Sequence, residues 1–127
     1  MKAKNGRKRL EKYLSVQQYK ALSRLCKGEE REYFAEMLDE LATRVETMPK
    51  IYEQDGKGDD AIVYLHYFTG GYDWYITEIS GDEGFGLCCI FERELGYVSI
   101  PELTKVGAEL DLHWTPKRLG DVKPCAV

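Results

Sequence analysis

A chain of 127 residues, 43% of them hydrophobic, is long enough for one domain that buries roughly two-thirds of its unfolded surface. No apolar run approaches the roughly 18 residues of a membrane span, and no hydrophobic segment follows the basic start MKAKNGRKRLEKYL. The four cysteines include no CxxC pair. We therefore expect a single soluble domain, residues 1 to 127, in the reducing cytoplasm, with no membrane association.

The net charge of -4 conceals a strong asymmetry along the chain. Residues 1 to 27 carry nine Lys or Arg and one acid, Glu11, which gives a balance of +8. Residues 28 to 127 carry nine bases and twenty-one acids, which gives a balance of -12. A basic segment can meet nucleic acid, an acidic partner or the protein's own surface, whereas an acidic body is repelled by phosphate backbones.

The first twelve residues combine charge, a glycine and little apolar content, which predicts a flexible basic arm. Such an arm could bind the phosphates of a nucleic acid, which is one alternative function for the chain. The candidate residues for that contact are Lys2, Lys4, Arg7, Lys8, Arg9 and Lys12.

Residues 13 to 48 read as helical. Ser15 and Gln18 fit a capping box at the start of a first helix, which Gly28 would end. The second helix, about 29 to 47, shows apolar residues at intervals of three or four and acids in its first turn. Pro49 would stop this helix.

The segment from 61 to 116 reads as an antiparallel sheet. Runs rich in Val, Ile, Tyr and Phe predict strands at about 61–68, 73–79, 85–91 and 96–99. Ser99 and Pro101 open a short helix. An alternating edge strand over 110–115, closed by Pro116, follows it. The predicted fold is α+β: two N-terminal helices packed on a four- to five-stranded antiparallel sheet, with a short helix before the last strand.

Catalytic and metal motifs are not evident. His66 and His113 have no partner at the spacing of a known site, and adjacent Cys88 and Cys89 sit among apolar neighbours that favour buried thiols. The run GDEGFG at 81–86 lacks the Lys and the helix of a phosphate-binding loop. We therefore expect no enzymatic activity, no metal and no cofactor.

The sheet segment also carries acidic residues, which usually lie on the surface, among its aromatic residues. Most of the aromatic residues are expected in the core, but Tyr and Trp ringed by acids also suit a protein interface. The candidate protein-binding residues are Asp73, Trp74, Glu78, Asp82, Glu83, Glu92 and Glu94. A further alternative is a small hydrolase built on Glu78, His66 and Tyr97, which requires these three groups to meet in one pocket.

Several runs between Pro49 and Val122 resemble a bacterial family of plasmid-related domains of unknown function. The most specific are Trp74 to Glu78, Phe85 to Leu87, and Glu94 to Tyr97. The helix at 29–47 is an insertion relative to that pattern. The resemblance implies a setting on plasmids, phages or integrated elements, and it supplies no catalytic residues.

The leading hypothesis is a non-enzymatic, acidic protein-binding factor of a mobile genetic element. Its partner would be a host complex that handles nucleic acid, and its specific form an inhibitor of a CRISPR or restriction defence complex. The acidic surface would then occupy a basic groove meant for nucleic acid. The sequence leaves the oligomeric state open.

Overall fold

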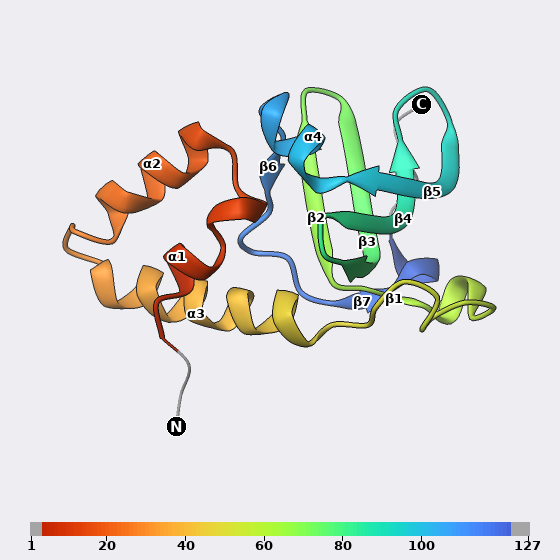
Figure 1. Cartoon of the computed structure of the whole chain (residues 1–127), viewed down its shortest axis with the longest axis horizontal. Helices are drawn as coiled ribbons and strands as arrows, with labels where there is room; N and C mark the ends of the chain where they lie inside the picture. Colours follow the sequence, from red (N-terminus) through yellow and green to blue (C-terminus); the bar gives the residue numbers. More distant parts are fainter. Residues whose placement is uncertain (1–3, 123–127) are drawn as a thin grey trace.

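The computed structural model describes residues 4 to 122 (Figure 1). The helices are α1 (Gly6–Arg9), α2 (Val16–Leu25), α3 (Arg31–Thr47) and α4 (Ile100–Lys105), with short 3-10 turns η1 (Glu11–Tyr13), η2 (Gly58–Asp60) and η3 (Leu119–Asp121). The strands are β1 (Ile62–Val63), β2 (Leu65–Thr69), β3 (Tyr72–Ser80), β4 (Glu83–Cys89), β5 (Arg93–Ser99), β6 (Glu109–Leu110) and β7 (Lys117–Arg118).

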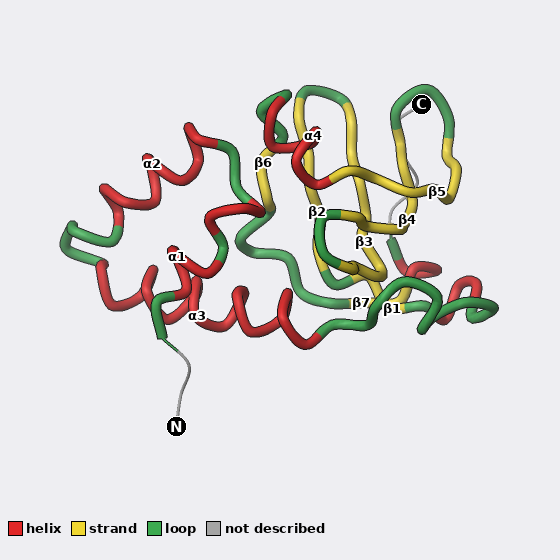
Figure 2. The backbone as a smooth tube through the Cα atoms, in the orientation of Figure 1, coloured by secondary structure: helices red, strands yellow, loops and turns green. Residues whose placement is uncertain are grey.

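The main sheet has five antiparallel strands in the order β5-β4-β3-β2-β6, and β1 pairs separately with β7. Figure 2 shows the sheet in yellow, on the opposite side of the molecule from most of the helical residues. The predicted α+β class and antiparallel sheet are confirmed. The edge strand predicted over 110–115 is wrong beyond Leu110, because the Asp111 side chain accepts from the His113 amide and the chain turns there. Because β5 ends the strand order, no strand within residues 4–122 pairs with its outer edge.

Figure 1 shows α1, α2 and α3 gathered beside β6 and β2, while α4 lies against the sheet. The Ser15 hydroxyl caps α2, since it accepts from the Gln18 amide at 3.1 Å. A capping box would also require the Gln18 side chain to bond to the Ser15 amide, and this bond is not formed among the described residues. The Gln18 side chain exchanges two hydrogen bonds, of 2.8 and 2.9 Å, with the backbone of Leu110, and so ties α2 to β6.

The expectation of a flexible arm over residues 1–12 is wrong for the part that the structure describes. Gly6 is buried against α3, and its amide donates to the Asp39 carboxylate at 2.6 Å. Leu10 is fully buried among the core residues. Apolar burial at Leu10 and the absence of a Gly6 side chain allow α1 to dock on α3, a contact that charge content alone does not reveal.

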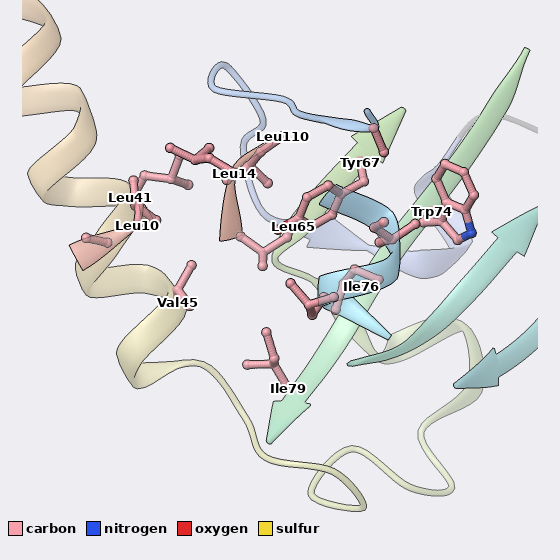
Figure 3. Packing of buried hydrophobic residues seen from close by; sticks show 14 of the residues in the cluster. Leu10, Leu14, Leu41, Val45, Leu65, Tyr67, Trp74, Ile76, Ile79 and Leu110 are labelled. Carbon is pink, nitrogen blue, oxygen red and sulfur yellow. The ribbon is translucent and has the colours of Figure 1, made fainter. Parts of the chain in front are cut away.

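The main core fills the space between the helices and one face of the sheet, here called the helix-side face. Figure 3 shows Leu10, Val45, Leu65 and Ile76 pointing into this space from α3, the N-terminal segment and the strands. Tyr67 is fully buried there, and its hydroxyl donates to the Tyr13 carbonyl at 2.6 Å. Burial raises the pKa of the Tyr67 hydroxyl well above its usual value.

The other face of the sheet, here called the tail-side face, is covered by residues 111 to 122. Its smaller core is centred on Tyr75 and Leu87 and is closed by Leu119 and Val122. The Trp114 ring packs against this cluster and donates from its indole nitrogen to the Val63 carbonyl at 3.0 Å. The tail-side cover leaves the β4–β5 end of this face open, and the candidate site lies there.

Candidate protein-binding site

A pocket of about 140 Å³ lies between the tail-side face and the loop that follows α3. In Figure 1 this loop, yellow-green, extends beyond the lower end of the sheet. The pocket is mostly apolar, but two carboxylates and three hydroxyl groups are among its lining side chains. The side chains that the site uses come from the loop (Ile51, Tyr52, Asp55), from β3 (Thr77, Glu78), from β4 and β5 (Phe85, Leu95, Tyr97) and from η3 (Leu119).

A β-bulge places the Glu78 carboxylate in this pocket. The register of β3 with β4 runs from Ile76 opposite Gly86 to Glu78 opposite Phe85, so Thr77 is an extra residue. Simple alternation would put Glu78 on the helix-side face with Ile76. The bulge reverses the alternation and sends Glu78 to the tail-side face.

Glu78 is a buried carboxylate to which no described residue supplies a cation. Only 4% of its surface is exposed. Its Oε1 accepts from the Tyr52 amide at 2.5 Å, and its Oε2 lies 3.1 Å from the Thr77 hydroxyl. None of the ion pairs formed within residues 4–122 includes Glu78.

Tyr52 and Tyr97 form the mouth of the pocket. Tyr52 has a backbone φ of 80°, a strained value for a residue with a bulky side chain. This conformation points the Tyr52 amide at Glu78, and the Tyr52 hydroxyl lies 3.3 Å from that of Tyr97. The hydrogen bond to Tyr52, and to a smaller extent the charges of Glu83 and Asp55, raise the pKa of Tyr97.

The apolar surface continues from the pocket onto β5. Phe85 and Tyr97 contact each other edge to face, with ring centroids 5.1 Å apart. Leu95 and Tyr97 are 55% and 52% exposed, and Tyr52 is 71% exposed. These three residues are called the rim below. Since β5 also has an unpaired outer edge among the described residues, the rim borders a strand that a partner chain could extend.

The seven predicted protein-binding residues do not form one surface. Glu78 lines the pocket, exposed Asp82 lies in the adjacent β3–β4 turn, and exposed Glu83 begins β4. Glu92 and Glu94 are exposed at the opposite end of β4 and β5. Trp74 is only 7% exposed and belongs to the main core, so its prediction as a surface contact is wrong. Asp73 is half-buried and pairs with His66, away from the pocket.

His66 belongs to a separate cluster on the tail-side face. Its Nε2 lies 2.7 Å from an Asp73 oxygen and its Nδ1 lies 3.0 Å from an Asp111 oxygen. The imidazole stacks on Tyr75 with centroids 4.7 Å apart, and burial followed by the two carboxylates raises the Tyr75 pKa. His66 does not line the pocket, so the Glu78, His66 and Tyr97 arrangement of a hydrolase is not formed.

Replacing His66 with phenylalanine is expected to lower the free energy of unfolding by about 1–2 kcal/mol. The ring could still stack on Tyr75, but two part-buried carboxylates would lose their shared partner. Urea denaturation measures the loss. His113→Phe, at the exposed histidine, should change stability by less than about 0.5 kcal/mol. Equal stability of the two variants would mean that the carboxylate contacts contribute nothing.

Three of the six predicted nucleic-acid contacts are engaged within the protein. Arg7 donates to Ser23 and lies over the Tyr19 ring, and Lys12 lies 3.5 Å from Asp82. Arg9 binds Glu46 through two nitrogens and thereby lowers the pKa of the Glu46 carboxyl. Lys4 and Lys8 are exposed, and Lys2 lies outside the described residues.

The described residues also bear on whether the chain has a cysteine nucleophile, a metal site or a membrane-spanning helix. Cys88 is part-buried, and burial, followed by the Glu94 charge, raises the pKa of its thiol, which disfavours a nucleophilic thiolate. Among residues 4–122, no three His, Cys, Asp or Glu side chains gather as a metal site would require. In the same part of the chain no helix has the length and apolar character needed to cross a membrane.

The sequence did not identify Tyr52, Phe85 or Leu95 as site residues. The sequence carried one signal for the bulge. The core residues Trp74 and Ile76 are two positions apart, as in a regular strand, but the next, Ile79, follows after three positions. The positive φ of Tyr52 has no such signal, since glycine is the usual residue there. Comparison of the chain with protein-family models, curated proteins and solved structures finds no match.

Proposed function

We propose that the chain is a non-enzymatic protein-binding module that contacts its partner through the rim, the pocket and the edge of β5. The observation that carries this proposal is the exposure of Tyr52, Leu95 and Tyr97 around one pocket and beside an unpaired strand edge. Aromatic residues next to a pocket are typical centres of binding energy. A partner strand added to β5 would gain main-chain hydrogen bonds as well.

The charge of the chain favours a basic partner. Residues 28 to 127 have a balance of -12, and Asp55, Asp82 and Glu83 are exposed near the rim. Opposite charges raise the rate of encounter and suppress wrong partners. A host complex that handles nucleic acid has such a basic surface, so an inhibitor encoded by a mobile element, directed at a CRISPR or restriction complex, remains the specific form of this proposal.

Direct nucleic-acid binding is less well supported. Arg7, Arg9 and Lys12 are occupied by Ser23, Glu46 and Asp82 respectively. These contacts would have to break before the three bases could meet phosphates. A protein partner requires no such change.

Selection of random peptides on the immobilised chain tests the proposal. Selected peptides should bind Leu95→Ser/Tyr97→Ser about tenfold or more weakly than the unmodified chain. The matched control is Val16→Ser/Leu25→Ser, because these residues are 65% and 43% exposed and both lie on α2. Equal binding by both double variants, or binding that does not weaken as salt rises, would contradict the proposal.

A further inference from the structure

The geometry points to a more specific role for the pocket, which rests on the proposed function: it takes the cationic side chain of one Lys or Arg residue of the partner protein. The Glu78 carboxylate would bind the charged group, and the aromatic residues of the mouth would enclose it.

The Glu78 carboxylate is buried and can still accept further hydrogen bonds. A carboxylate that is 96% buried usually has a cationic partner, because removing a charge from water is costly. Among residues 4–122, the hydrogen-bond partners of the Glu78 carboxylate are the Tyr52 amide and the Thr77 hydroxyl. Its two oxygens offer roughly four acceptor positions, so hydrogen-bonding capacity remains for an ammonium or a guanidinium group.

The walls of the pocket are aromatic and apolar side chains that suit a cationic group on an aliphatic stem. Cations bind favourably over the faces of tyrosine and phenylalanine, and Tyr52, Tyr97 and Phe85 all line the pocket. Ile51 and Leu119 add apolar surface that suits the methylene stem of Lys or Arg. Asp55 lines the pocket and Glu83 is exposed at the start of β4, so both add negative charge near the mouth.

The size of the pocket favours a single side chain. Its volume of about 140 Å³ is well below the roughly 300–1,000 Å³ that pockets for drug-sized ligands have. A side chain delivered by a partner that lies along β5 fits this volume. The remainder of the binding energy would come from the rim and the strand edge.

Glu78→Gln removes the charge while keeping the local hydrogen bonds. The Thr77 hydroxyl lies 3.1 Å from both the Glu78 carboxylate and the Phe85 carbonyl, and it has one proton to donate. In the variant, the hydroxyl can donate to Phe85 and accept from the new amide, while the Tyr52 amide keeps its acceptor. We therefore expect the variant to unfold at an equal or higher Tm, because an uncompensated buried charge is gone.

Titration with butylammonium and with ethylguanidinium, followed by two-dimensional NMR of backbone amides, tests the inference without a partner protein. Saturable shifts should centre on Thr77, Glu78 and Tyr97. Both cations should bind Glu78→Gln at least about tenfold more weakly. Glu92→Gln is the matched control, because it removes one exposed charge at the opposite end of β4 and β5 and should change affinity by less than about threefold.

Two outcomes would overturn the inference. One is equal binding of the cations to the unmodified chain and to Glu78→Gln, or equal binding of uncharged butanol. The other is a clear loss of Tm in Glu78→Gln with cation binding unchanged, which would make Glu78 a structural residue. Failure of the peptide selection at the rim with normal cation binding would instead contradict the proposed function and leave the pocket chemistry standing.

Discussion

Replacing Gly86 with alanine is expected to lower the free energy of unfolding by about 3 kcal/mol. A Cβ at Gly86 would lie 1.9 Å from the Tyr75 carbonyl oxygen and 2.8 Å from its carbon. Both atoms belong to the backbone of β3, so they cannot move aside as a flexible side chain would. The strands would have to separate next to the bulge that positions Glu78. Urea denaturation measures the change in stability.

Gly96 provides a matched control for this prediction. It lies directly opposite Gly86 in the register of β4 and β5, and nothing lies within 4 Å of a Cβ built there. Gly96→Ala should therefore be neutral or stabilise by less than about 1 kcal/mol. A similar loss of stability in both variants would indicate that the close packing of Gly86 on the β3 backbone is not the cause.

Gly6→Ala is expected to destabilise the protein by about 2–3 kcal/mol and to release α1 from α3. The new Cβ would lie 2.2 Å from both the Asp39 nitrogen and the Leu38 carbonyl carbon. Displacing α1 would also expose Leu10, which is fully buried. Urea denaturation and hydrogen exchange of the Leu10 amide, which donates to the Gly6 carbonyl at 2.9 Å, report the two effects.

The control for Gly6 is Gly28→Ala, since a Cβ at Gly28 would have no contact closer than 3.6 Å. Its unfolding free energy should stay within about 0.5 kcal/mol of the unmodified chain. If Gly6→Ala were equally harmless, the N-terminal residues would behave as the flexible arm that the sequence predicts, and the basic side chains would be available to nucleic acid.

The regular elements were largely predictable because local patterns determine them. The predicted helix at 29–47 corresponds to α3, which begins at Arg31 and ends at Thr47 before Pro49. The Ser99 hydroxyl caps α4 as expected, since it accepts from the Glu102 amide at 3.3 Å. The four main strands also lie close to their predicted positions. In each case neighbouring residues contain the information.

Features that depend on distant residues were not predicted. The docking of α1 requires that a glycine at position 6 meets the backbone of Asp39. Charge density in the first twelve residues favoured a mobile arm, but the apolar side chain of Leu10 outweighs it. The pairing of Gln18 with Leu110 joins residues 92 positions apart, which no local pattern reports.

The candidate site was predicted only in part for the same reason. Glu78 was identified as a binding residue, but as one of seven acids and aromatics on a shared surface. The bulge at Thr77 and the positive φ of Tyr52 determine its position, and both are backbone features. Strain at Tyr52 and an unpaired charge at Glu78 reduce stability, and such costs are expected where a surface is selected for binding.

The affinity of selected peptides for Glu78→Gln tests the central claim most directly. Peptides that contain Lys or Arg should bind this variant about 30-fold more weakly than the unmodified chain, because the cation loses its carboxylate. The same peptides with norleucine in place of the cationic residue should bind both proteins equally weakly. Equal dissociation constants of the Lys or Arg peptides for the unmodified chain and for Glu78→Gln would contradict the claim.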